Sequence, residues 1–197
     1  PAGTAPVAVG PTGAPQPAGP TASPAVPAAA LNRDQALAAA PRVGIDTPVL
    51  DGSINLVGGR IDDVGFKKYR ETVDPKSPEI DLLSPAGGKD PYFADFGWLS
   101  DAGSPVKVPG PDTVWTQKGT AKLGIGAPVT LTWDNGEGFV FERVVSVDDR
   151  YMFEITDKVK NTSGRATTLY PYSVLTREGT PQTAGYYVLH EGAIGVF

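Results

Sequence analysis

Several residue types are scarce or missing in this sequence of 197 residues. It has no cysteine and one histidine, which excludes disulfides, thiolate metal sites, cysteine nucleophiles and mechanisms that need two imidazoles. No apolar run approaches the ~20 residues of a membrane span, so we expect no bilayer crossing in this chain. The net charge of -5 argues against a general nucleic-acid binder, which would normally be basic.

Glycine and proline, in contrast, are abundant, with 24 and 20 residues. This content is too high for a helical bundle, whereas the aromatic and β-branched content is too high for full disorder. The composition therefore predicts a mostly β protein with a disordered part.

The disordered part is expected at the N-terminus, over residues 1–31. Residues 1–30 hold eight prolines and ten alanines, and no charged residue precedes Arg33. Prolines at this density prevent helix and sheet, which predicts an extended spacer. A proline-rich ligand is disfavoured because no basic residue lies beside the prolines. Since the chain starts at Pro1 without a signal peptide, we also expect it to be a piece of a longer protein.

A short helix is predicted at the boundary, over residues 32–42. Asn32 is a good N-cap, and Gln35 lies at the position that completes a capping box. The alanine-rich segment 36–40 favours helix, and Pro41 ends it. We expect two turns at most.

Residues 43–197 predict an antiparallel β-sandwich, because apolar and polar residues alternate with a period of two. Segment 129–177 is predicted to form a four-stranded meander, in which Arg143 interrupts an apolar face. The apolar terminus 193–197 indicates a chain cut inside a strand and a truncated sheet. The expected strands cover residues 45–50, 53–57, 61–69, 80–84, 92–99, 114–116, 129–133, 139–147, 151–159, 170–175, 186–190 and 194–197.

Two kinds of titratable residue pair could be catalytic. His190 and Glu191 are neighbours, but neighbours on a strand point to opposite faces, so we interpret them as a strand end entering a turn. Asp62–Asp63 and Asp148–Asp149 are paired carboxylates, as glycoside hydrolysis requires, yet such neighbours are typical of solvated turns. We therefore predict no catalytic residues.

Other motifs also have simple structural interpretations. Gly58–Gly59 and Gly87–Gly88 lack the surrounding pattern of phosphate loops and are expected to be turns. The sequon at 161–163 is expected to be a turn as well. Asp112, Asp134 and Asp157 are scattered without calcium-loop spacing, so no metal or cofactor site is predicted.

The aromatic residues could line a sugar site or fill the core. Alternation favours the core for Trp133 and Tyr170. Trp98 and Trp115 lie in loop-rich sequence, where the pattern does not decide between a sugar site and the core. The complete set is Trp98, Trp115, Trp133, Tyr170, Tyr172, Tyr186 and Tyr187.

Five segments, in order, resemble the large periplasmic domain of the bacterial membrane protein insertase family YidC, in its alphaproteobacterial form. The similarity spans about residues 43–197, and the proline-rich lead resembles the linker after that family's first membrane helix. The segments are 47–61 with 67–69, 128–135, 147–153 with 159–161, 170–172, and 187–192.

The resemblance implies a β-supersandwich related to galactose mutarotase, in the periplasm of an inner-membrane protein. It implies a non-catalytic, cofactor-free domain of an insertase that inserts and folds membrane proteins, alone or with the Sec translocon. The expected partners are Sec components and nascent membrane proteins, with no nucleic acid and with membrane contact only through segments absent here. The family's insertion segments are also absent, so no functional residue is carried over and the partner-binding residues stay unknown.

A carbohydrate-binding or mutarotase-like module is the alternative. As the resemblance to that enzyme family would have it, catalysis requires more than one histidine, typically with a glutamate, and this chain has only His190. Passive sugar binding needs only aromatic and polar groups and stays open.

Overall fold

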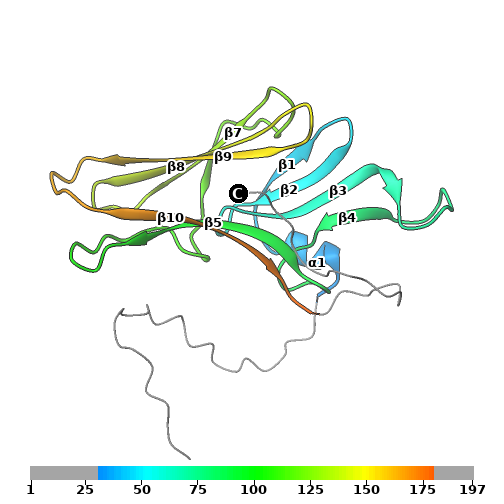
Figure 1. The fold of residues 1–197 in the computed structure, drawn as a ribbon, viewed down its shortest axis with the longest axis horizontal. Helices are drawn as coiled ribbons and strands as arrows, with labels where there is room; N and C mark the ends of the chain where they lie inside the picture. The colour runs from blue at the N-terminus through cyan, green and yellow to red at the C-terminus, as the bar shows by residue number, and fades with distance from the viewer. Residues whose placement is uncertain (1–30, 180–197) are drawn as a thin grey trace, which may run out of the picture.

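The computed structural model describes residues 31–179, which form one short helix and ten strands (Figure 1). The helix is α1 (Arg33–Ala38). The strands are β1 (Arg42–Asp46), β2 (Leu50–Asn55), β3 (Arg60–Arg70), β4 (Glu79–Leu83), β5 (Tyr92–Ser100), β6 (Thr116–Lys118), β7 (Val129–Asp134), β8 (Phe139–Val147), β9 (Phe153–Asn161) and β10 (Leu169–Arg177).

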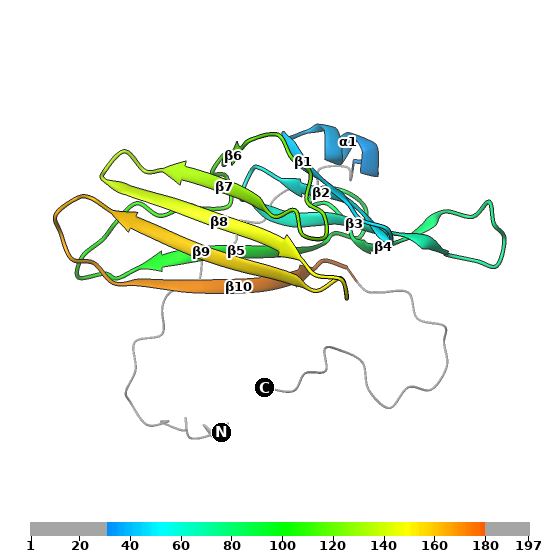
Figure 2. The same ribbon diagram turned by 90° about the horizontal axis from the view of Figure 1, so that it is seen from above.

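The strands form two antiparallel sheets that pack face to face, as predicted (Figure 2). The six-stranded sheet has the order β1-β2-β3-β5-β10, with β4 also paired to β3. The four-stranded sheet has the order β6-β7-β8-β9. Among residues 31–179, both β9 and β10 are therefore edge strands, and Figure 2 shows them on the same side of the sandwich.

The predicted four-stranded meander is wrong in its last strand. Strands β7, β8 and β9 pair in sequence, but β10 crosses to the other sheet and pairs with β5. The β5–β10 register runs from Leu169 opposite Ser100 to Arg177 opposite Tyr92. Alternation predicts that a segment is a strand but not which partner it finds, because pairing depends on contacts distant in sequence.

Some predicted strand boundaries also differ. The predicted strand 45–50 is divided between β1 and β2, because the Thr47 hydroxyl accepts a hydrogen bond from the Leu50 amide and closes a turn. The predicted strand 151–159 begins only at Phe153, since Tyr151 has a φ of 65°. The predicted strand 114–116 is displaced to β6, which starts at Thr116.

The predicted helix is confirmed. The Asn32 side chain accepts a hydrogen bond from the Gln35 amide at 2.8 Å, and the Gln35 side chain accepts one from the Asn32 amide at 3.1 Å. This capping box satisfies amides that the first helical turn leaves free. Within residues 31–179, no helix has the length and apolar character to cross a membrane.

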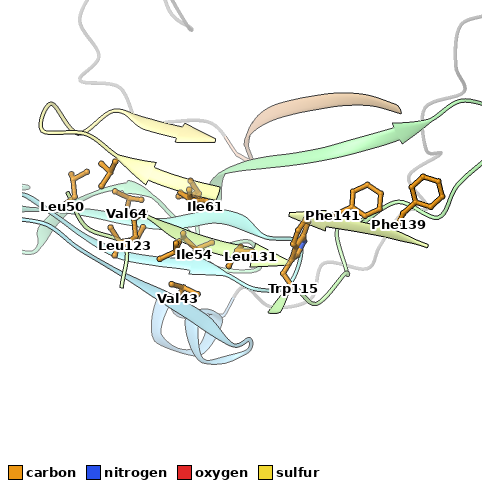
Figure 3. Close-up of a cluster of buried hydrophobic side chains, with 14 of the residues drawn as sticks. Val43, Leu50, Ile54, Ile61, Val64, Trp115, Leu123, Leu131, Phe139 and Phe141 are labelled. Carbon is orange, nitrogen blue, oxygen red and sulfur yellow. The ribbon is translucent and has the colours of Figure 1, made fainter. Parts of the chain in front are cut away.

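The hydrophobic core lies between the two sheets and extends along the sandwich (Figure 3). In β8, alternate side chains from Phe139 to Val147 are buried, as the sequence pattern predicts. Burying each large apolar side chain contributes roughly 1.5–3 kcal/mol. The largest fully buried apolar residues are Trp115, Phe139, Phe141, Leu50, Ile54, Leu123 and Leu131.

Candidate functional site

Arg143 lies in the middle of the apolar core face of β8 and is completely buried. Its guanidinium donates two hydrogen bonds of 2.8 Å to Asp157, its direct partner on β9. This bidentate geometry compensates the cost of burying both charges. In the sequence, Arg143 is only an interruption of the apolar pattern and Asp157 only an isolated carboxylate. The signal that could have joined them is that each occupies a core-facing position.

Arg143 also joins the two sheets. It donates to the carbonyl oxygens of Gly59 at 3.2 Å and Phe96 at 3.0 Å, both on the six-stranded side. Its guanidinium carbon lies 5.0 Å from the centre of the Trp115 ring and 5.4 Å from that of Phe96, within cation–π distance. Arg143 therefore holds β8 at a fixed position above the opposite sheet.

The interpretation of Asp62 and Asp63 as turn residues is wrong. Both lie within β3, and they are only 1% and 7% exposed. The register shifts here, from Ser53 opposite Asp63 to Ile54 opposite Ile61, so Asp62 is the extra residue of a β-bulge. A bulge changes the strict alternation of faces, which allows both carboxylates to reach cationic partners.

Two arginines neutralise these carboxylates. Arg33 of α1 donates to Asp63 at 2.5 Å, and Arg42 of β1 forms a salt bridge with Asp62. Ser53 connects the pairs, since its hydroxyl accepts from Arg42 at 2.6 Å and donates to Asp63 at 2.5 Å. This ion-pair cluster (Arg33, Arg42, Ser53, Asp62 and Asp63) occupies both carboxylates and fixes α1 to the sheet, so it offers no acid–base pair.

The other turn predictions hold. Asp148 accepts hydrogen bonds from the amides of Arg150 and Met152, both at 2.8 Å, and closes the β8–β9 turn with Asp149 exposed. Gly58, Gly59 and Gly87 have positive φ angles, which turns require and glycine adopts without strain. Asn161 accepts from the Ser163 amide at 2.9 Å, so the sequon also forms a turn.

Among residues 31–179, no group of three or more histidine, cysteine, aspartate or glutamate side chains is arranged to hold a metal ion. Asp157 is paired with Arg143, and Asp134 accepts from the Gly136 amide at 2.8 Å in the β7–β8 turn. His190, Glu191, Tyr186 and Tyr187, like the predicted strands 186–190 and 194–197 and the linker over 1–30, lie outside the described residues.

The structure resolves the roles of the remaining aromatic residues. Trp115 is a core residue with 2% exposure, and Trp98 and Trp133 are half-buried against the core, each beside Phe141. The prediction for Trp133 is therefore confirmed. The core prediction for Tyr170 is wrong, since this side chain is 52% exposed. Tyr170 is in β10, and the pairing with β5 directs it away from the opposite sheet.

A groove lies between the edge strands β9 and β10, over the floor formed by β5. Its larger part has a volume of about 470 Å³ and its smaller part about 270 Å³, with Trp98 lining both. We refer to it as the β9–β10 groove. Its lining residues are Phe96, Trp98, Phe139, Ile155, Asp157, Val159, Asn161, Thr167, Leu169, Pro171, Tyr172 and Ser173.

The groove is chiefly apolar and aromatic, with few polar groups. Among the described lining residues, Asp157 is the only one that carries a charge at neutral pH, and the bidentate pair with Arg143 neutralises that carboxylate. Ser173, Thr167 and Asn161 add neutral hydrogen-bonding groups. Such a lining suits an apolar segment with backbone polar groups better than a charged ligand.

Comparison with known proteins identifies the family. The model of the YidC periplasmic domain family matches residues 42–197. The chain belongs to this family. The domain is therefore periplasmic, and the two-sheet fold agrees with the predicted β-sandwich.

Similar proteins named "Membrane protein insertase YidC" occur in alphaproteobacteria. That of Methylobacterium nodulans is 59% identical over 177 residues, covering 90% of this chain and 29% of the relative. That of Bradyrhizobium diazoefficiens is 52% identical over 183 residues, covering 90% and 30%. That of Methylobacterium sp. strain 4-46 is 60% identical over 170 residues, covering 86% and 27%. The chain thus spans less than a third of the length of these relatives.

Proposed function

We propose that this chain is a non-catalytic interaction domain of an inner-membrane insertase that inserts and folds membrane proteins, alone or with the Sec translocon. In this proposal the β9–β10 groove holds an extended apolar segment of a nascent membrane protein or of a Sec component. The names of the relatives support the insertase activity, and they favour it over the carbohydrate-binding or mutarotase-like alternative.

The groove is the observation that carries the proposal. It combines apolar walls from both sheets with two strand edges that no other strand of residues 31–179 pairs with, and these are the two features that extended polypeptides recognise. Three carboxylates singled out in the sequence are instead occupied, since Asp62, Asp63 and Asp157 are each paired to an arginine. These carboxylates therefore act in the proposal as structural groups.

Site-specific photocrosslinking in the full-length insertase tests the proposal. A photoreactive residue replaces Ser173 in the groove, and the control replaces Thr72, which is exposed in the segment between β3 and β4. We expect Ser173, but not Thr72, to give crosslinks to an inserting membrane protein or a Sec subunit in inner-membrane vesicles. Equal yields at the two positions would overturn the role of the groove.

A further inference from the structure

The helix α1 is attached to the sandwich through a small number of contacts. It has six residues, and Ala36 is the one that is buried. Just before the helix, the Leu31 amide donates to the Gly87 carbonyl at 2.9 Å. A helix this short is not stable in water by itself. The structure of α1 therefore depends on its contacts with the sandwich.

Arg33 makes the strongest of these contacts. Its guanidinium donates to the carboxylate of Asp63 in β3 at 2.5 Å. It also lies 3.1 Å from the carboxylate of Asp81 in β4 and donates to the Leu83 carbonyl at 3.4 Å. One side chain of α1 thus connects the helix to two neighbouring strands.

The surface that Arg33 contacts is strongly acidic. Gly65 of β3 lies opposite Asp51 of β2 and opposite Asp81 of β4. A Cβ atom on Gly65 would lie 3.0 Å from Oδ1 of Asp51 and 3.7 Å from Oδ1 of Asp81, so both carboxylates lie over this glycine. Asp63 precedes Gly65 by two residues in the same strand. The cation of Arg33 therefore offsets the mutual repulsion of three carboxylates.

Arg33 is more accessible to solvent than the second arginine of the ion-pair cluster. The side chains of Arg42 and Asp62 are 11% and 1% exposed, whereas those of Arg33 and Asp63 are 29% and 9% exposed. Salt screens exposed charges much more than buried ones. The attachment of α1 can therefore be lost while Arg42 keeps β1 paired to Asp62.

We propose that α1 is a releasable clasp, held by the Arg33–Asp63 pair and weakened by salt. In the closed form, the chain before Leu31 meets the sandwich beside Gly87. In the released form it meets the sandwich at Arg42, and residues 31–41 can extend up to about 35 Å, at ~3.3 Å per residue. The clasp thereby sets the length of the connection between the sandwich and the chain before it. This inference is independent of the β9–β10 groove.

Hydrogen–deuterium exchange in the full-length insertase tests the release. Arg33→Met should speed the exchange of the α1 amides about tenfold and leave β8 unchanged, because the loss of one charged hydrogen bond opens the helix alone. Arg150→Met, in the exposed β8–β9 turn, is the control and should change neither. In the unmodified protein, raising the salt from about 0.05 M to about 0.5 M should speed α1 exchange about threefold.

A disulfide provides a lock for the closed form. A Cβ atom on Gly88 would lie 3.9 Å from the Cβ atom of Ala36, which is the separation found in disulfides. The chain has no cysteine of its own, so Ala36→Cys with Gly88→Cys can be introduced into a full-length insertase without other cysteines. The oxidised form should lose the salt response of α1, and the reduced form should keep it. Equal responses would overturn release of the helix.

Spin labels measure the change in length. They are attached at Leu31→Cys and Lys118→Cys, two exposed positions, and Arg33→Met should add a longer distance to the distribution. Arg33→Lys keeps the charge and should resemble the unmodified protein more closely. An unchanged distance distribution, or unchanged α1 exchange in Arg33→Met, would overturn the clasp. A rise in exchange shared by β8 would also overturn it, since Arg33 would then stabilise the whole domain.

Discussion

The outer face of the six-stranded sheet, the face turned away from the four-stranded sheet, differs at its two ends. At the end that α1 covers (Figure 1), this face carries the ion-pair cluster on β1 to β3. The carboxylates of Asp62 and Asp63 are buried there. On β5 and β10 this face carries Leu99, Tyr170, Tyr172 and Val174, which are 38–58% exposed. Charged groups are thus buried at the end on β1 to β3, which we call the covered end. Apolar groups are exposed at the end on β5 and β10, which we call the bare end.

This comparison shows that residue type does not decide burial on this face. The carboxylates are buried because α1 covers them and supplies Arg33. Over the β5–β10 end the described residues place no helix or strand, only the loop 109–111 at the edge of a cavity beside Tyr172 and Val174. A covered polar surface is stable only when each group finds a partner. The following predictions test the difference between the ends, from the largest expected effect to the smallest.

The largest effect is expected for Arg42→Met at the covered end. This substitution leaves the carboxylate of Asp62 buried without its cation, which costs about 3–5 kcal/mol in the free energy of unfolding. Denaturant unfolding of this domain in the full-length protein measures the change. The double variant Arg42→Met with Asp62→Leu should recover part of the loss, and a single variant as stable as the parent would contradict the role of the pair.

An intermediate effect is expected for Gly97→Ala at the bare end. A Cβ atom on Gly97 would lie 2.5 Å from the ring of Tyr172, which covers this glycine from the neighbouring strand. Because the tip of the partly exposed Tyr172 ring can move away, we expect a cost of about 1 kcal/mol, at the lower end of what overpacking costs in a rigid core. The same unfolding measurement should show that Tyr172→Ala in the Gly97→Ala background relieves much of the loss, whereas equal effects of Gly97→Ala in both backgrounds would exclude the ring contact.

A small effect is expected for Tyr170→Ala at the bare end. The side chain is half-exposed, so its loss should change the free energy of unfolding by no more than about 0.5 kcal/mol. Phe141→Ala, in the core, is the matched comparison and should cost about 3–5 kcal/mol. A large loss for Tyr170→Ala would mean that the bare end is covered in the folded protein.

The smallest effect, with the opposite sign, is expected for Asp81→Asn beside the cluster. Burial raises the pKa of Asp81 above its ordinary 3.8, and the nearby Arg33 only partly opposes this. Because the folded state then binds the proton more tightly, ionisation of Asp81 lowers stability as the pH rises through this raised pKa. Asp81→Asn should therefore be slightly more stable than the parent at pH 7, and the difference should vanish below about pH 3. Urea midpoints at both pH values measure this, and a less stable variant at pH 7 would show that the Arg33 contact dominates.

The candidate site was only partly predictable. The alternation of Ile155 and Val159 indicates a face of β9, but the groove exists only because β10 leaves the meander and pairs with β5. The pairing of Arg143 with Asp157 depends on a register between two strands, and that of Asp63 with Arg33 depends on where α1 docks. No local pattern specifies either arrangement.

What the sequence by itself determined about this protein is its local structure and its family. The capping box at Asn32, the turns at Asp148 and Asn161, and the alternation along β7 to β9 are properties of a few adjacent residues, and the structure agrees with them. Only the tertiary structure decided the partner of β10, the burial of Asp62 and Asp63, and the position of the groove. The physical reason is that strand pairing and burial are set by the contacts that distant segments make with one another, and a period of two residues carries no information about those contacts.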